Sequence, residues 1–194
     1  MTLSAKVFVR VHIRWMIRRD LAEVLEIERA SSPDAWDELE FLDQLRRRNC
    51  IGMVADLHDQ VAGYMIYELG KRELKVLRLV VDPRWRRKGV GAQMVAKLVG
   101  KLSHLRRSRI WVHVRESNLA AQLFLRSQRF RAVEIVRECY ADTNEDAYVF
   151  CYALESLSDP SLRSNPLKRP VSQDCERENL PPWSSSSDPV EGDS

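Results

Sequence analysis

The chain has 194 residues, with 31 Lys and Arg against 28 Asp and Glu and a formal net charge of +3 at pH 7. That length is sufficient for one domain with a buried core and an additional segment. No apolar run approaches the roughly 18–20 residues that cross a bilayer, and the four cysteines show neither metal-ligand spacing nor a disulfide framework. We therefore expect a soluble, cytoplasmic protein without a membrane partner or a bound metal.

Charge and composition divide the chain into two segments. Residues 1–154 carry 27 Lys and Arg against 20 Asp and Glu, whereas residues 155–194 carry 4 against 8. The second segment also holds six of the eight prolines and the serine run Ser184 to Ser187. Such a composition buries too little apolar surface to offset the entropy of ordering. We predict one folded domain over 1–154 and a disordered C-terminal tail over 155–194.

The pattern of apolar residues predicts the elements of the first segment in chain order. Alternation over residues 7–16 predicts a strand and is unlike the apolar core of a signal peptide. Asp20 and Glu23 have the spacing of a capping box at the start of a helix. The remaining predicted elements are a helix over 35–48, strands over 51–56, 61–68 and 74–81, a helix from Gly89 to about Leu105, a strand over 110–115, a helix over 118–128, and strands over 132–138 and 147–154. Their order is β-α-α-β-β-β-α-β-α-β-β, a mixed α/β or α+β domain.

The connection after the strand that ends at Val81 has the properties of a phosphate site. A proline and a basic stretch lead into a helix that begins through Gly89 and Gly91. The first amides of a helix lack partners and lie at the positive end of its dipole, and glycines allow a ligand to approach the backbone closely. No Gly-Lys-Ser/Thr follows, which argues against a P-loop.

The spacing Arg86-x-x-Gly89-x-Gly91-Ala92, directly after Val-Asp-Pro, resembles the acetyl-CoA signature of the GNAT superfamily of N-acetyltransferases. The predicted element order is similar to the GNAT fold over about residues 9–154. The resemblance implies an α+β fold with a mixed, mostly antiparallel sheet of about seven strands and about four helices. It also implies that the sheet opens beside the phosphate loop, so that the thioester arm of acetyl-CoA enters it.

The same resemblance implies which residues bind acetyl-CoA. The backbone of the strand end should pair with the pantetheine arm, and the loop and first helical turn should hold the phosphates. Asn118 is expected to contact the pantetheine arm and also to cap a helix. The implied binding residues are Leu79, Val80, Val81, Arg86, Arg87, Lys88, Gly89, Val90, Gly91, Ala92 and Asn118.

Within the superfamily, the chain looks most like the ribosomal-protein-alanine N-acetyltransferases. The features that carry this likeness are Ala35-Trp36, the run from Ile110 to Arg115 followed by Ser117-Asn118, and Arg137 to Tyr140 ahead of Glu145-Asp146-Ala147. The likeness implies transfer to a protein or peptide amine, with an N-terminal α-amino group favoured and a ribosomal protein as one candidate. It implies no direct nucleic-acid binding.

Two residues are the catalytic candidates that the resemblance implies. His113 stands where relatives have a glutamate base, and a histidine with a pKa near 6.5 can do the same work. Tyr140 corresponds to a tyrosine that protonates the leaving thiolate, since a phenol carries its proton at pH 7. The chain departs from its relatives at Leu125, where many have another tyrosine, and at Arg129, where a glycine usually ends the helix.

Alternatives remain open for both assignments. His113 can equally be a half-buried histidine that is hydrogen-bonded to its neighbours, and Tyr140 a wall residue of the sheet. The acceptor can be a small amine instead of a peptide. The departures also leave room for a non-catalytic GNAT-fold module that binds acyl-CoA.

Overall fold

The computed structural model describes residues 8–32, 35–103, 106–140 and 142–154, so the predicted tail over 155–194 lies outside the described residues. The strands are β1 (His12–Trp15), β2 (Cys50–Leu57), β3 (Gln60–Leu69), β4 (Glu73–Val81), β5 (Arg109–Arg115), β6 (Arg131–Tyr140) and β7 (Glu145–Ala153). The α-helices are α1 (Leu21–Ser31), α2 (Glu38–Arg46), α3 (Val90–Val99) and α4 (Leu119–Ser127), with 3-10 turns η1 (Arg18–Asp20) and η2 (Pro83–Trp85). The predicted order of strands and α-helices is confirmed.

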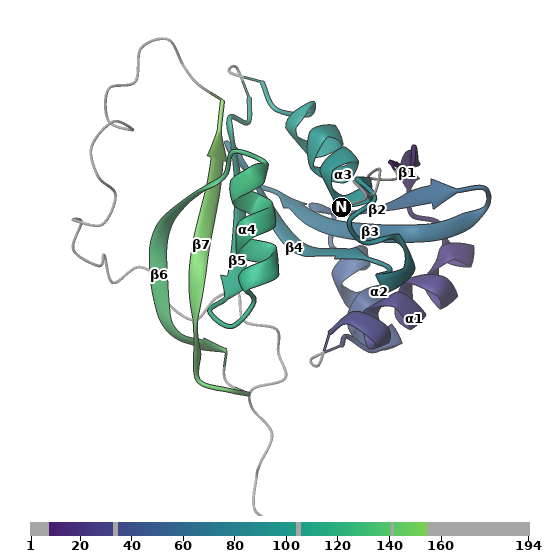
Figure 1. Ribbon diagram of the computed structural model, residues 1–194, viewed down its shortest axis with the longest axis horizontal. Helices are drawn as coiled ribbons and strands as arrows, with labels where there is room; N and C mark the ends of the chain where they lie inside the picture. Colours follow the sequence, from purple (N-terminus) through teal and green to yellow (C-terminus); the bar gives the residue numbers. More distant parts are fainter. Residues whose placement is uncertain (1–7, 33–34, 104–105, 141, 155–194) are drawn as a thin grey trace, which may run out of the picture.

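The strands form one seven-stranded sheet in the order β1-β2-β3-β4-β5-β7-β6. Every neighbouring pair is antiparallel except β4 and β5, which run parallel and pair only over Glu73–Val76 and Arg109–Val112. Figure 1 shows the result, in which β1 to β4 and β5 to β7 diverge from this short contact. The mixed, mostly antiparallel sheet that the sequence predicts is therefore confirmed.

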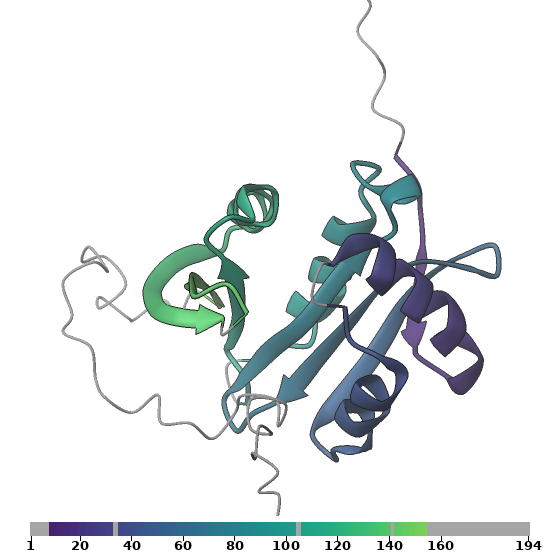
Figure 2. The ribbon, with the colours of Figure 1, turned by 90° about the horizontal axis from the view of Figure 1, so that it is seen from below.

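Helices cover both faces of the sheet and define two apolar clusters. Helices α3 and α4 contribute Met94, Leu98 and Leu125 to the larger cluster, here called the α3/α4 cluster, which includes residues of β2 to β5 and β7. Helices α1 and α2 contribute Val24 and Phe41 to the smaller cluster over β2 and β3, here called the α1/α2 cluster. Figure 2 shows α4 on one side of β5 to β7, and α1 and α2 beside the β1 to β4 half. Each helix therefore buries one apolar face, as its periodicity predicts.

Two of the predicted boundaries are wrong. The first strand covers only His12–Trp15, because the preceding residues run beside α3: the side-chain amide of Gln93 donates to the Val9 carbonyl at 2.7 Å and accepts from the Val11 N–H at 3.1 Å. The helix after the glycines ends at Val99, with Gly100 as its C-cap, because glycine has a low propensity to continue a helix.

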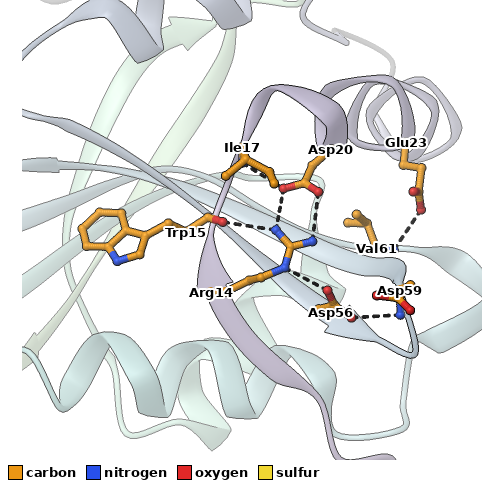
Figure 3. Close-up of polar contacts among 8 residues, drawn as sticks. All are labelled: Arg14, Trp15, Ile17, Asp20, Glu23, Asp56, Asp59 and Val61. Carbon is orange, nitrogen blue, oxygen red and sulfur yellow. Dashed lines mark hydrogen bonds and ion pairs between the residues drawn. The ribbon is translucent and has the colours of Figure 1, made fainter.

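The predicted capping box at Asp20 is also wrong, and an ion-pair network replaces it. The buried Asp20 carboxylate accepts from the Arg14 guanidinium at 2.7 and 2.9 Å and from the Ile17 N–H at 2.9 Å. Arg14 also donates to Asp56 at 2.8 Å, and Glu23 accepts from the Val61 N–H at 2.9 Å (Figure 3). The network therefore fixes the start of α1 to β1, β2 and the start of β3.

A non-glycine residue in the left-handed region ends α4. Arg129 has φ of 67°, and the Phe130 N–H donates to the Leu125 carbonyl at 3.1 Å while the Arg129 N–H donates to the Arg126 carbonyl at 3.0 Å. These two bonds make a Schellman motif, whose left-handed position favours glycine. The buried contact of Phe130 with Leu125 holds the motif closed despite the arginine.

Removing the charge of Asp20 should destabilise the fold. The Asp20→Asn substitution keeps the side-chain shape but loses charge-assisted hydrogen bonds from Arg14, and we expect the free energy of unfolding to fall by about 2 kcal/mol. Asp43→Asn is the control, because the Asp43–Arg46 pair is exposed and should change it by less than about 0.5 kcal/mol. Urea unfolding measures both, and equal effects would refute the structural role of Asp20.

Replacing Arg129 with glycine should stabilise the protein. Glycine adopts the left-handed conformation without the steric cost of a Cβ, so Arg129→Gly should add about 1 kcal/mol, roughly 2–4 °C in Tm. Arg126→Gly, inside the same helix, should instead remove about 1 kcal/mol. Thermal unfolding should show a higher Tm for Arg129→Gly and a lower Tm for Arg126→Gly. An unchanged or lower Tm for Arg129→Gly would contradict a cost of the left-handed conformation.

Candidate active site

The sheet opens where the pairing of β4 with β5 ends, and a bulge in β4 lies at that point. Ile66 is opposite Arg78 and Tyr67 is opposite Val76, so Leu77 has no residue opposite it on β3. The extra residue changes the alternation of β4. Val76 packs in the α3/α4 cluster, whereas Arg78 lies beside Glu28 of α1, so the two side chains are on opposite faces of the sheet.

The end of β4 leads directly into the predicted phosphate loop. Leu79 and Val81 pack against the α3/α4 cluster and Val80 against the α1/α2 cluster. Beyond the short paired segment, the β4 edge that faces β5 is not paired with it. A ligand in extended conformation can add to such an edge through the main chain, which places no demand on the side chains.

Two backbone conformations shape the loop. Arg87 has φ of 61° and Gly89, the N-cap of the ten-residue helix α3, has φ of 86°. A Cβ at Gly91 would lie 3.2 Å from the Phe124 ring, so glycine permits α4 to pack against the first turn of α3. Val90 is buried and Ala92 is partly buried, so both can offer a ligand backbone groups only. The helix N-terminus and the glycines together suit a phosphate group.

The basic side chains of the loop do not all face the helix N-terminus. The Arg86 guanidinium donates to the Val81 carbonyl at 3.0 Å and to the Ser31 hydroxyl at 2.9 Å, so it turns toward α1. The Lys88 ammonium lies 4.5 Å from the centroid of the Trp85 ring. Arg87 is exposed at the loop surface. The three residues lie in one loop, and the exposed Arg86 guanidinium turns toward α1. Their role as acetyl-CoA ligands stays a prediction.

His113 lies on the face of β5 that points away from the α3/α4 cluster. Its neighbours Val112 and Val114 are buried in that cluster, and His113 itself keeps exposed surface. Partial desolvation by the surrounding protein, and secondarily the charge of Lys75 on β4, lower the pKa of His113 below its usual 6.5. A neutral imidazole at pH 7 can accept a proton, as a general base must.

Tyr140 stands apart from His113 on the same face of the sheet. Tyr140 pairs with Glu145, whereas His113 pairs with Val149, four residues further along β7, which is about 13 Å of strand. The Arg115 guanidinium lies 3.9 Å from the centroid of the Tyr140 ring. The structure therefore places these two predicted catalytic residues on one surface without bringing them into contact.

Arg115 joins the end of β5 to the β6–β7 hairpin. Its guanidinium donates to Asp142 at 2.9 Å, to the Thr143 hydroxyl at 2.9 Å and to Glu145 at 3.2 Å. Hydrogen bonds from Ser117 and Arg115 lower the pKa of the Glu145 carboxyl, and those from Arg115 lower the pKa of the Asp142 carboxyl. The cluster remains ionised at neutral pH and fixes the hairpin that carries Tyr140.

Asn118 occupies the cap position that the sequence predicts. Its side-chain oxygen accepts from the Ala121 N–H at 3.0 Å, at the start of α4. This satisfies one of the open amides of the helix. Asn118 is exposed, close in sequence to Arg115 at the end of β5, so the cap leaves its amide group at the surface.

A buried cluster that the sequence did not predict lies at the last turn of α1, the end opposite Asp20. Glu28 is fully buried; it accepts from the Tyr64 hydroxyl and from the Trp36 N–H at 3.3 Å, and it lies 3.4 Å from the Nε of Arg78. The Arg78 guanidinium lies 4.6 Å from the centroid of the Trp36 ring. A glutamate on the apolar face of α1, among Leu21, Val24 and Leu25, was the available signal.

The described ranges contain neither a helix long and apolar enough to span a membrane nor a group of three His, Cys, Asp or Glu side chains that could hold a metal ion. Burial raises the pKa of the Cys50 and Cys151 thiols to about 11. Such thiols stay protonated at neutral pH and are poor nucleophiles.

Comparison with known proteins agrees with this geometry. The model of the Acetyltransferase (GNAT) family matches residues 21–130, more than half of the chain. The [Ribosomal protein bS18]-alanine N-acetyltransferase of Salmonella typhimurium is 29% identical over 133 residues, which are 67% of this chain and 88% of that protein. The N-alpha-acetyltransferase of Sulfolobus acidocaldarius is 25% identical over 166 residues, 79% of this chain and 98% of that protein.

Solved structures give the same fold. The ribosomal-protein-S18-alanine N-acetyltransferase of Escherichia coli superposes with a TM-score of 0.68 at 23% identity, covering 78% of this chain and 98% of that one. NAA60 of Arabidopsis thaliana, solved with acetyl-CoA, superposes with a TM-score of 0.66 at 17% identity, covering 75% and 100%. At these identities the likeness establishes the fold.

The lowered pKa of His113 is open to direct measurement. Lys75→Gln should raise the pKa of the imidazole, because a nearby positive charge is removed, yet leave it below 6.5, because desolvation is the larger cause. Lys97→Gln, on the exposed surface of α3, should leave it unchanged. An NMR titration of the His113 ring gives these values, and a pKa at or above 6.5 in the unsubstituted protein would contradict the structure.

Proposed function

The chain belongs to the GNAT family of acetyltransferases, and on that premise we propose that it acetylates the N-terminal α-amino group of a protein or peptide. The family uses acetyl-CoA as donor, so the protein is an acetyl-CoA-dependent N-acetyltransferase. The observation that carries the choice of acceptor is the likeness to the Salmonella and Sulfolobus enzymes over 88% and 98% of their lengths. A ribosomal protein is therefore one candidate acceptor.

The proposed donor site runs from the open edge of β4 to the start of α3. The main chain of Leu79, Val80 and Val81 pairs with the pantetheine arm, with Asn118 contributing from the start of α4. The amides of the first turn of α3, together with Arg87 and Lys88, hold the phosphates. The loop and first turn of this proposed cradle comprise Arg86, Arg87, Lys88, Gly89, Val90, Gly91 and Ala92.

His113 is the proposed base for the acceptor. An α-amino group has a pKa near 8, so loss of one proton produces the nucleophile at neutral pH. The neutral amine attacks the thioester carbonyl, a C–N bond forms, and the tetrahedral adduct collapses with cleavage of the C–S bond. The ammonium loses its first proton to solvent, and His113 takes the second proton, which the nitrogen gives up as the C–N bond forms, directly or through one water. Two observations support this role. The imidazole is neutral at pH 7, and it lies on the face of β5 away from the α3/α4 cluster, where we place the acceptor.

Tyr140 is the proposed acid for the leaving thiolate, and this role is the less demanding one. The thiol of CoA has a pKa close to the 8.5 of free cysteine, so the thiolate leaves without full protonation. A tyrosine held by Arg115 can still donate a proton to it. Much of the rate enhancement can come from holding both reactants together in the opening.

Two finer assignments complete the proposal. We place the activity in the cytoplasm, where acetyl-CoA and newly synthesised N-termini are both present. We take residues 1–154 as the catalytic domain and residues 155–194 as a separate C-terminal tail, because the two segments differ in charge and proline content. We propose no nucleic-acid contact, because the acceptor is recognised through an amine.

A titration of acetyl-CoA into the protein tests the donor site. Calorimetry should detect micromolar binding that is lost in the double variant Gly89→Glu, Gly91→Glu, because two carboxylates at the helix N-terminus repel the phosphates. The added side chains also meet the rings of Phe8 and Phe124. Gly100→Glu, at the other end of the same helix, should bind normally. A folded wild-type protein that fails to bind acetyl-CoA would sink the proposed function.

An acceptor screen tests the rest, starting with peptides that begin with alanine. These peptides should accept acetyl groups, whereas the same peptides with blocked N-termini and free polyamines should not. His113→Ala should lower kcat by a factor on the order of 100, and Tyr140→Phe by less. Preference for polyamines would replace the peptide acceptor with a small amine, and unchanged turnover in both variants would remove the catalytic assignments.

A further inference from the structure

We propose that Arg86 and Ser31 form a positioning contact that couples acetyl-CoA binding at the phosphate loop to the acceptor-side wall around Trp36. Neither side chain touches the reacting atoms in this scheme. Binding of the donor holds the loop, the loop holds the end of α1, and the end of α1 holds the segment that precedes α2. The assignment of that segment to the acceptor rests on the proposed function.

The first step of the coupling is the side chain of Arg86. Its Nη2 donates to the Ser31 hydroxyl at 2.9 Å and its Nε donates to the Val81 carbonyl at 3.0 Å. One guanidinium therefore bridges the loop, the end of β4 and the last residue of α1. The residue that the sequence suggests as a phosphate ligand instead connects the donor loop to a helix on the acceptor side.

The second step is one turn of α1. Ser31 and Glu28 are three residues apart, so they are neighbours on the helix surface. The buried Glu28 carboxylate accepts from the Trp36 N–H and from the Tyr64 hydroxyl and is paired with Arg78. Removing a buried carboxylate from such partners costs several kcal/mol. The last turn of α1 and the Trp36 backbone therefore move together.

The third step is the packing of Trp36 itself. Its ring lies 4.6 Å from the Arg78 guanidinium and contacts Phe41 edge-on, with ring centroids 5.4 Å apart. Arg78 follows the β4 bulge, on the face of the sheet that also carries His113. A displacement of the last turn of α1 therefore changes the wall of the surface where we place the acceptor.

The loop has a physical reason to respond to the donor. Arg87 and Gly89 both have positive φ within three residues, and a non-glycine residue in that region is strained by its Cβ. A phosphate bound by the amides favours the conformation shown here over alternatives, so the population shifts toward it. The Arg86–Ser31 contact is then formed for a larger fraction of the time.

Hydrogen–deuterium exchange of the full chain, with and without saturating acetyl-CoA, tests the coupling without any acceptor. In the wild type, acetyl-CoA should slow exchange of the Ser32 and Trp36 amides, which donate to the Glu28 carbonyl and carboxylate. Ser31→Ala should bind acetyl-CoA within about threefold of the wild type yet lose most of that protection. Ser127→Ala, at the last residue of α4, is the matched control and should keep it.

Steady-state kinetics give a second test, because a residue that only stabilises the fold would not change KM for the acceptor alone. Ser31→Ala should raise KM for the acceptor peptide about fivefold, a coupling of typical size, while KM for acetyl-CoA stays nearly constant. Ser31→Thr, which keeps the hydroxyl that accepts from Arg86, should restore most of the acceptor KM. Full protection in Ser31→Ala, or no protection in a wild type that binds acetyl-CoA, overturns the coupling alone. No acetyl-CoA binding at all overturns the proposed function as well.

Discussion

The short parallel contact between β4 and β5 is the constraint on which the rest of the molecule depends. Four residue pairs hold the two strands together, and beyond Val76 and Val112 the strands separate. An unpaired strand edge is ordinarily a liability that proteins cover or disrupt. Here the edge is tolerated because the α3/α4 cluster continues across the opening, from Met65 and Val76 on one side to Val112 and Phe150 on the other. The core keeps the two halves of the sheet together although their backbones diverge.

This opening explains why the backbone carries most of the proposed donor contacts. Leu79 and Val81 are committed to the core, Val90 is buried in it, and Arg86 is committed to α1. What remains for a ligand is the β4 edge and the amides at the start of α3. In the proposed donor site, a pantetheine arm and a phosphate are therefore bound largely through these main-chain groups. Side-chain identity is then needed mainly on the opposite face, where His113 and Arg115 lie.

The sequence predicted the element order and the loop because both depend on local signals. Apolar periodicity reflects which face of an element is buried, and Gly89 sits where only a residue tolerant of positive φ fits easily. The side of β4 taken by Arg78 could not be predicted, since it depends on a bulge set by pairing with β3. The direction of Arg86 was equally hidden, because its partner Ser31 is 55 residues away in the chain. Asp20 resembled a helix cap, but Arg14 competes for the same carboxylate.

Helix α1 is fixed at both ends, which decides where movement near the site can occur. Its start is held by the buried Asp20, paired with Arg14, and its last turn by Glu28 and Ser31. The first anchor joins β1 and β2, whereas the second joins β3, β4 and the phosphate loop. An 11-residue helix is about 16 Å long and behaves as a rigid rod over that length. A shift of the phosphate loop must therefore pivot α1 about Asp20, which concentrates the displacement at Glu28 and at the segment that carries Trp36.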